Sequence, residues 1–446
     1  MKKFFKENGS VNLAVLIIIA IIVICLAVFI IKTVKPTSQS GNSNTQRSLN
    51  DNPEEEPEEE PEEEPIEDID YKSEDFSYEF LKMESKENEG TNIIYSPLSI
   101  KYALNLLNEG ANGKTKEEID NIIGDLKLTK YKNIDKVMSL ANSVWIRERY
   151  KDEVLDSYNK AVEDKYNAEI KYDKFESAKN INRWISDKTF GIINDFFTDE
   201  RIKDDEELFM ILVNALAIDM EWDSNFSTNN TANGIFDKDG SNLNVAFMKK
   251  SNVFEDGISY KIDDDVTVLA MDLKEYDGVQ LEFDAIMPNE EALDEFITNI
   301  DSQKIDKYLS NLTKASETED DVNVKVPKFD FDYSIMLKQE LMAMGMKLAF
   351  GRSADFSKIT GDDSLYVNDA IHKADIEFSE EGIRAAAVTT FMLNSKALIS
   401  ENDVINVNID KPFLFVIRDK ETGEDWFVGS VYNPVLWDDV KAEYNK

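Results

Sequence analysis

Very few side chains in this sequence could carry out covalent or metal chemistry. His372 is the single histidine, and Cys25, the single cysteine, lies inside an apolar run. Neither a Gly-x-Ser-x-Gly nor a His-Glu-x-x-His pattern occurs, so a catalytic triad or a zinc site lacks the residues that it needs. We therefore expect no enzymatic activity, no metal site and no cofactor.

Two acidic runs, at residues 237–240 and 263–265, resemble the first positions of calcium loops. Neither run is followed by the glutamate that an EF-hand requires at its twelfth loop position. We expect both runs to form turns, because Asp and Gly favour turn conformations.

The segment from Gly382 to Asp410 has the pattern of a strand that is able to enter a sheet. It contains no proline, so every backbone N–H could join a hydrogen-bond ladder. Alternation would place uncharged side chains on one face, namely Ile383, Ala385, Ala387, Thr389, Phe391 and Leu393. Arg384, the only charged residue before Lys396, falls on the other face. The segment is therefore a candidate conformational switch.

An apolar run near the start of the chain predicts a membrane anchor. Residues 13–31 are nineteen consecutive apolar residues, and such a length spans a hydrocarbon core of about 30 Å. A cleaved signal peptide is the alternative, but no small-x-small cleavage pattern follows before Lys32. Lysines at positions 2, 3 and 6 favour a cytoplasmic N-terminus. We expect a single-pass protein of the cell membrane, with its C-terminal domain extracellular.

Composition divides the chain into four parts: a short cytoplasmic segment (1–12), the transmembrane anchor (13–31), a disordered Pro/Glu-rich linker (32–70) and a globular domain (71–446). Thirteen acidic residues and no basic one lie between Asp51 and Asp70, and this self-repulsion extends a linker. The whole chain has 89 acidic and 50 basic residues. This balance argues against nucleic-acid binding, which needs clustered Lys and Arg.

The globular part predicts an α+β domain. Ser96 caps a helix that begins at Pro97 and ends at Gly110, and Thr115 with Glu118 forms a capping box for a second helix. The apolar run at 209–218 predicts a buried strand. Further strands are expected at 266–272, 279–287, 322–326, 371–378, 404–409, 413–418 and 426–431. The first half is thus expected to be helical and the second half rich in strands.

Six motifs in the right order resemble those of the serpin family over roughly residues 71–434. They lie at 92–100, at 212–226, at 326–329, at 337–346, at 372–382 and at 411–434. The resemblance implies the serpin fold, with helices around three mostly antiparallel β-sheets and an exposed reactive loop. The residue usage and the cysteine-free outer domain suggest a bacterial source.

The resemblance implies an inhibitor that a protease attacks as if it were a substrate. In inhibitory serpins the cleaved loop inserts into the central sheet and traps the acyl-linked protease. We therefore expect a monomeric suicide inhibitor that forms a covalent complex with a serine protease. The alternatives are a non-inhibitory serpin that serves as a surface binding or scaffold protein, or an inhibitor of chymotrypsin-like, subtilisin-like or cysteine proteases.

Site residues follow from the same resemblance. The shutter, a polar cluster under the sheet, is matched by Ser96, Ser99, Asn214 and His372. The breach is matched by Trp222 and Lys328, and the hinge by Glu380, Gly382, Ile383, Ala385, Ala386 and Ala387. Lys328 and Glu380 match a salt bridge. Without the resemblance, His372 would be interpreted as a core histidine whose hydrogen bonds are satisfied. The other shutter, breach and hinge residues would be interpreted as ordinary core and capping residues.

The reactive bond is expected at Lys396–Ala397, because inhibitory serpins usually place the specificity residue fourteen positions after the hinge glycine. Lys396 is also the only basic residue between Arg384 and Lys411, which favours a trypsin-like target. Cleavage at residues 391–393 remains the alternative. The chain departs from the family pattern at Ile383, where Thr or Ser is usual, and at 219–220, where Lys-Gly is usual. The segment 397–410 is longer than usual.

Overall fold

A computed structural model describes residues 69–124, 128–203, 208–238, 240–362, 364–368, 370–383 and 403–444. Residues 64–446 form one compact unit. The predicted anchor at 13–31 lies outside the described residues, as does the linker up to residue 68. Among the residues that are described, no helix is long and apolar enough to cross a membrane.

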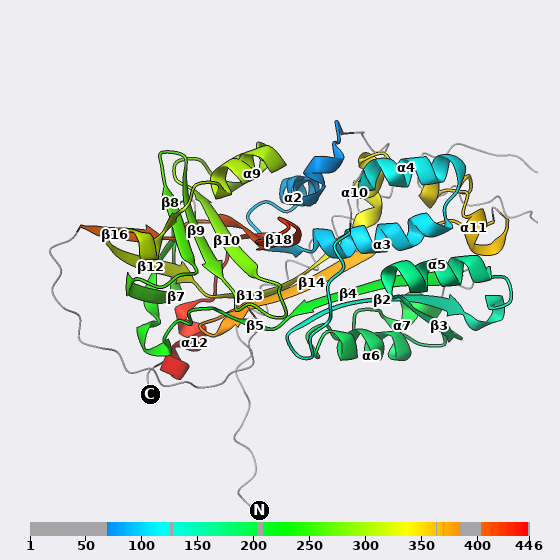
Figure 1. The fold of residues 1–446 in the computed structure, drawn as a ribbon, viewed down its shortest axis with the longest axis horizontal. Coiled ribbons are helices and arrows are strands. Elements are labelled where there is room, and N and C mark those ends of the chain that lie inside the picture. Colours follow the sequence, from blue (N-terminus) through cyan, green and yellow to red (C-terminus); the bar gives the residue numbers. More distant parts are fainter. Residues whose placement is uncertain are drawn as a thin grey trace, which may run out of the picture. The chain divides into compact units, whose positions relative to one another are not determined.

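The strands of the described chain form four hydrogen-bonded sheets (Figure 1). The largest has, in order, β1 (Ile93–Tyr95), β18 (Asp425–Val431), β17 (Phe413–Asp419), β10 (Leu281–Pro288), β9 (Val266–Asp272), β8 (Ile258–Ile262) and β11 (Thr313–Lys314). The second has β16 (Val404–Asn408), β12 (Asp321–Pro327), β7 (Ser241–Val253) and β6 (Ala232–Lys238).

The other two sheets adjoin each other along the chain, where β4 (Met210–Ile218) is followed by β5 (Met220–Glu221). One contains β13 (Phe329–Met336), β14 (Ile371–Phe378), β15 (Gly382–Ile383) and β5, and the other contains β3 (Glu169–Asp173), β2 (Met138–Arg147) and β4. Only Asp219 separates β4 from β5, so the two sheets form a single composite sheet, which we call the central sheet. With these two counted together, the described residues form three sheets. Of the strand pairs given for the described residues, only β2–β3 and β12–β16 are parallel.

The helices surround these sheets. They are α2 (Phe76–Glu87), α3 (Pro97–Gly110), α4 (Gly113–Ile123), α5 (Asp156–Tyr166), α6 (Lys179–Lys188), α7 (Asp199–Lys203), α8 (Leu293–Thr298), α9 (Ser302–Leu309), α10 (Leu337–Ala343), α11 (Ser357–Thr360) and α12 (Trp437–Tyr444). Short 3-10 turns lie at η1 (Ser73–Asp75), η2 (Glu148–Tyr150), η3 (Thr228–Asn230), η4 (Ala315–Glu317) and η5 (Leu348–Phe350).

The strand predictions agree with the structure to within two residues at each end. For example, β9 and β14 have the predicted bounds 266–272 and 371–378. The expectation of a helical first half was wrong in part, because β1, β2 and β3 lie there. Nine consecutive residues of β2 are buried, so the strand lacks the alternation that identifies a half-exposed strand.

One helix start was predicted correctly and one was not. The Ser96 side chain accepts a hydrogen bond of 3.0 Å from the Ser99 N–H, as expected for the cap of α3. The capping box was wrong, because α4 already begins at Gly113. The Thr115 hydroxyl instead accepts from the Asp355 N–H at 2.9 Å, and Glu118 accepts from the backbone N–H groups before and within η5. Both side chains therefore hold distant loops.

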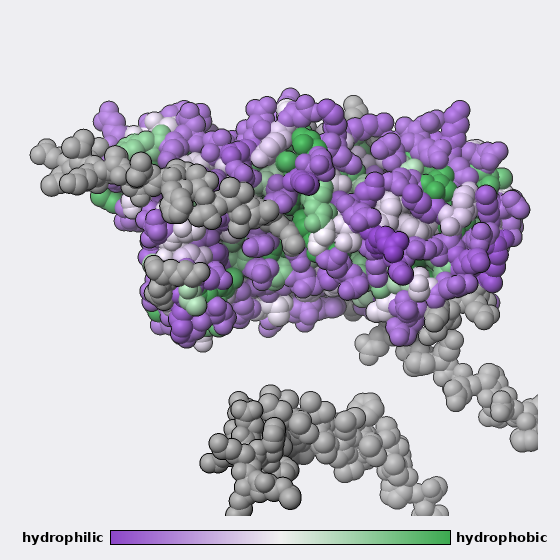
Figure 2. Space-filling view, turned by 90° about the horizontal axis from the view of Figure 1, so that it is seen from below, coloured by the Kyte–Doolittle hydropathy of each residue, from purple (hydrophilic) through white to green (hydrophobic). Residues whose placement is uncertain are grey.

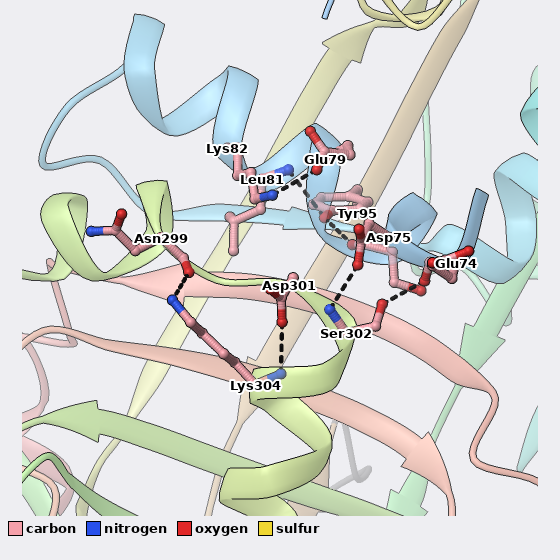
Figure 3. A network of polar contacts seen from close by, with 11 residues as sticks. Glu74, Asp75, Glu79, Leu81, Lys82, Tyr95, Asn299, Asp301, Ser302 and Lys304 are labelled. Carbon is pink, nitrogen blue, oxygen red and sulfur yellow. Dashed lines mark hydrogen bonds and ion pairs between the residues drawn. The ribbon is translucent and has the colours of Figure 1, made fainter. Parts of the chain in front are cut away.

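Polar contacts hold η1 against the start of α9 (Figure 3). Asp75 accepts a hydrogen bond of 2.9 Å from the Ser302 N–H, and the Ser302 hydroxyl donates to the Glu74 carbonyl. Asp301 caps α9 by accepting from the Lys304 N–H at 2.7 Å. The chain segments that meet here are 227 residues apart in sequence, so the contact is a long-range one. The outer surface in Figure 2 is mostly hydrophilic, as the acidic composition leads one to expect.

Candidate functional site

The predicted hinge begins inside the central sheet. Ile383 pairs with Phe378 of β14 on one side and with Met220 of β5 on the other. Its side chain is only 2 % exposed, so the face predicted to be uncharged is the buried one here. The hinge residues Ala385, Ala386 and Ala387 and the reactive bond Lys396–Ala397 lie outside the described residues.

Gly382 is required by a close backbone approach. It pairs with Glu221 of β5, and a Cβ atom at this position would lie 2.1 Å from the Met220 carbonyl oxygen. Such a contact is far inside van der Waals distance and involves backbone on both sides. Any side chain here would push β15 away from β5.

Trp222 holds the turn that leads into β15, which we call the hinge turn (residues 379–382). Its backbone N–H donates to the Glu381 carbonyl at 2.9 Å, and its indole Nε1 donates to the Ser379 carbonyl at 2.9 Å. The ring packs edge-on against Phe378 at 5.1 Å. The departure at 219–220 therefore leaves Trp222 bonded to the hinge turn.

The ion pair expected from the resemblance is present at the same place. Lys328 Nζ lies 2.7 Å from Glu380 Oε2, and the Glu380 side chain is 3 % exposed. Thr231 donates to Glu380 Oε1 at 2.6 Å. Burial acts to raise the pKa of Glu380, but the Lys328 charge and the hydrogen bonds outweigh it and leave the pKa lowered. Glu380 is therefore a buried carboxylate whose charged form is stabilised by Lys328 and by its hydrogen bonds.

The four predicted shutter residues lie together and are linked in a chain. His372 Nε2 accepts from the Ser96 N–H at 2.9 Å, and the Ser96 side chain accepts from the Ser99 N–H. The Ser99 hydroxyl donates to Asn214, whose amide donates in turn to Asn142 at 2.7 Å. We call these five residues the polar cluster.

His372 is neutral in this arrangement. Burial lowers its pKa to about 4, and its Nε2 acts as an acceptor. His372 and Asn214 both bind the start of α3: His372 accepts from the Ser96 N–H, and Asn214 accepts from the Ser99 hydroxyl.

A cavity of about 750 Å³ separates β4 from β14. β4 is the end strand of its sheet, and β14 meets β15 only through Phe378. The cavity is lined mainly by apolar side chains from these strands and from the helices below, among them Ala103, Leu104, Leu212 and Leu341. Asn214 and His372 lie at its wall. The central sheet is thus closed where β15 pairs with β14 and β5, and it is open where the cavity lies between β14 and β4.

Sequence reasoning missed two contributors to the site. Asn142 is a buried polar residue in an apolar strand, the same signal that identified Asn214. Tyr444 Oη lies within hydrogen-bond distance of both Lys328 and Glu380, and nothing in the local pattern of residues 437–444 indicated this.

Each acidic run lies at the end of a strand: Asp237 and Lys238 are the last residues of β6, and residues 263–265 connect β8 to β9, as expected for a turn. Asp237 accepts from the Gly240 N–H at 2.8 Å, and Asp263 accepts from the Asp265 N–H at 2.9 Å. Within the described ranges, no group of three or more His, Cys, Asp or Glu residues could hold a metal ion.

Comparison with known proteins gives consistent matches. The family model described as "Serpin (serine protease inhibitor)" matches residues 71–434. An uncharacterized serpin-like protein of Thermococcus kodakarensis is 30% identical over 363 residues, which are 77% of this chain and 81% of that protein. Neuroserpin of Homo sapiens is 26% identical over 368 residues, 78% of this chain and 87% of its own. The solved structure of a thermophilic serpin, tengpin, in the native state has a TM-score of 0.65 at 26% identity and covers 83% of this chain and 96% of its own.

Proposed function

Because this chain belongs to the serpin family, we propose that it inhibits serine proteases by loop cleavage, acyl-enzyme trapping and insertion of the loop into the central sheet. Similar proteins include intracellular coagulation inhibitor 2 of Tachypleus tridentatus, which is 29% identical. Inhibitory members of this family inhibit proteases and are not enzymes themselves, whereas other members are non-inhibitory. The family and its inhibitor relatives support protease inhibition as the general function, and insertion is the mechanism that we propose for it.

The observation that carries the proposal is the open central sheet. The cavity of about 750 Å³ lies between the edges of β4 and β14, and β15 already occupies the space between β14 and β5. A strand that continued from Ile383 would enter this gap and pair with strands on both sides. The hinge supports this, because three small alanines follow Arg384 and no proline interrupts the segment.

Burial at the entry point also supports insertion. The side chain of Ile383 is 2 % exposed, and strand alternation would place Ala385, Ala387 and Thr389 on the same inward face. No charge would have to be buried on that face. Ile383, which stands where the family usually has Thr or Ser, is thus compatible with insertion, since isoleucine is β-branched and apolar.

We propose Lys396–Ala397 as the scissile bond and a trypsin-like enzyme as the target. The spacing from Gly382 and the isolation of Lys396 among uncharged and acidic residues support this. The test is to incubate the full chain, in mild detergent because of the run at 13–31, with trypsin and look for a complex that survives SDS. Lys396→Glu should abolish the complex, and Lys396→Arg should retain it.

Other outcomes identify the alternatives. A complex with chymotrypsin, subtilisin or papain, but not with trypsin, would indicate that the scissile bond is not Lys396–Ala397. Mass spectrometry of the released peptide would then identify the cleavage position. If every protease cuts the loop and stays active, and cleavage does not raise the melting temperature, a surface binding or scaffold role replaces inhibition.

We further propose that residues 13–31 anchor a monomeric inhibitor in a bacterial cell membrane, with the serpin domain outside. The length of the apolar run and its flanking lysines support this. Protease added to intact cells should remove the domain if it is displayed, and should leave it intact if it is cytoplasmic.

A further inference from the structure

Helix α12 lies outside the residues that the family model matches, yet it reaches the hinge. The family model ends at Pro434, and the next residues of the chain pair with Val245 and Ala246 of β7 and with Lys328. The Val435 N–H donates to the Lys328 carbonyl at 2.9 Å, and the Ala246 N–H donates to the Val435 carbonyl at 3.0 Å. These bonds fix the start of α12 beside β7 (Figure 1).

The last described residue, Tyr444, joins the ion pair at the hinge. Lys328 Nζ donates to Tyr444 Oη at 2.6 Å, and Tyr444 Oη donates to Glu380 Oε1 at 2.8 Å. The Trp437 ring stacks on the Tyr444 ring at 5.8 Å, which holds it in place. Burial raises the pKa of Tyr444 to about 12, so the hydroxyl keeps the proton that it donates.

Glu380 is held from several elements at once. Its side chain contacts Lys328, Thr231 and Tyr444. Its carbonyl accepts from the Phe226 N–H at 2.9 Å, as the neighbouring Glu381 carbonyl does from Trp222. Because the chain leaves the hinge turn towards the loop two residues later, the position of Glu380 sets where a strand can start to enter the sheet.

We propose that Tyr444 is a positioning residue for loop insertion: it braces the Lys328–Glu380 pair, holds the hinge turn in its uncleaved arrangement and slows insertion before a protease has cut the loop. This inference rests on the proposed insertion mechanism. The physical basis is that a hydroxyl bonded to both members of a buried ion pair stabilises one geometry of that pair. Moving the hinge turn would break both bonds.

The first test is hydrogen exchange in the full chain, with Tyr444→Phe as the variant. This change removes the hydroxyl and keeps the ring. The amides of Trp222 and Phe226, which donate to the hinge turn, should exchange about tenfold faster, because a charge-assisted hydrogen bond is lost. Tyr172→Phe, the same change at a partly exposed site on β3, should leave these amides unchanged. Equal exchange in wild type and Tyr444→Phe would overturn the proposal.

The second test separates positioning from simple stability. The uncleaved full chain is incubated, and the growth of a species that resists denaturant is followed as a measure of spontaneous insertion. Tyr444→Phe should speed this conversion about tenfold. In a Lys328→Met, Glu380→Gln background the same change should add little, because both members of the ion pair that it braces are gone. A lower unfolding midpoint with an unchanged conversion rate would also overturn the proposal.

The two inferences fail in different ways. If the wild type neither converts nor forms a stable complex with any protease, the insertion mechanism is wrong. The exchange measurement then still decides whether Tyr444 holds the hinge turn, since it needs no protease.

Discussion

His372 Nε2 on β14 accepts a hydrogen bond of 2.9 Å from the backbone N–H of Ser96, the cap residue of α3. The strand is therefore tied to the helix beneath it, and no hydrogen bond joins His372 to Asn214 on the facing strand β4. The two strands stay apart while each keeps its polar groups satisfied. This arrangement lets the central sheet be open while the His372 and Asn214 side chains keep hydrogen-bond partners.

The pKa of His372 makes stability depend on pH. Burial lowers the pKa to about 4 in the folded chain, compared with about 6.5 in an unfolded one. As the pH falls, the unfolded state binds a proton at His372 before the folded state does. The stability that the neutral histidine contributes is therefore fully present above pH 6.5 and is lost as the pH falls towards 4.

His372→Gln keeps an acceptor and removes the titration. Wild type should lose about 2–3 kcal/mol more unfolding free energy than the variant between pH 7 and pH 4. Denaturant titrations at several pH values measure this difference. Parallel curves for the two proteins would contradict the assignment.

The carboxyl pair of Glu84 on α2 and Glu340 on α10 should make the fold less stable as the pH rises, which is the opposite of the effect of His372. Burial, and then the nearby Glu84, raise the pKa of Glu340 to about 7. Tyr333 donates to Glu84 at 2.5 Å from β13, so the pair links α2, α10 and the central sheet. A folded pKa above the unfolded value means that stability is full below pH 4.5 and falls as the pH rises through 7.

Glu340→Gln removes this charge and keeps the size of the side chain. We expect the variant to be more stable than wild type by about 1 kcal/mol at pH 8, after allowance for solvent screening, and equal to it at pH 4. Thermal or denaturant unfolding at the two pH values measures the change. Glu163→Gln, at an exposed site on α5, is the control and should show no such dependence on pH.

Gly382→Ala should separate β15 from β5. The added methyl group would lie 2.1 Å from the Met220 carbonyl oxygen, so the backbone must move. We expect a loss of about 1–3 kcal/mol in unfolding free energy and faster amide exchange in peptides that contain Met220. Gly351→Ala, where the nearest atom is 3.9 Å away, should be nearly neutral. Similar losses in both variants would point to a general effect of replacing glycine.

Filling the cavity should favour the uncleaved form. Ala103 on α3 lines the cavity between β4 and β14, and Ala103→Leu would place apolar atoms inside it. The uncleaved chain should gain about 1 kcal/mol from the buried methyl groups. The rise in melting temperature on loop cleavage should shrink, because the inserted strand would meet the new side chain. Lys160→Leu adds a similar side chain at an exposed site and should change neither quantity.

Short-range patterns were sufficient for much of the fold. The cap at Ser96, the helix end at Gly110 and the bounds of β14 agree with the structure, because caps, breakers and alternation act over a few residues. The alternation that begins at Ile383 also identified the buried face correctly at its first residue. The capping box at Thr115 failed because Asp355, 240 residues away, competes for its hydroxyl.

What the sequence determined by itself is therefore the local character of each segment: where helices start, which runs are strands, and that the segment after Gly382 is able to become one. Only the tertiary structure decided which strand edges face each other across the cavity and which side chains surround Glu380. Its partners Thr231 and Tyr444 are 149 and 64 residues away in sequence. Contacts at such distances depend on how whole elements pack, and this is set by the burial of all of them together and not by the pattern of any one.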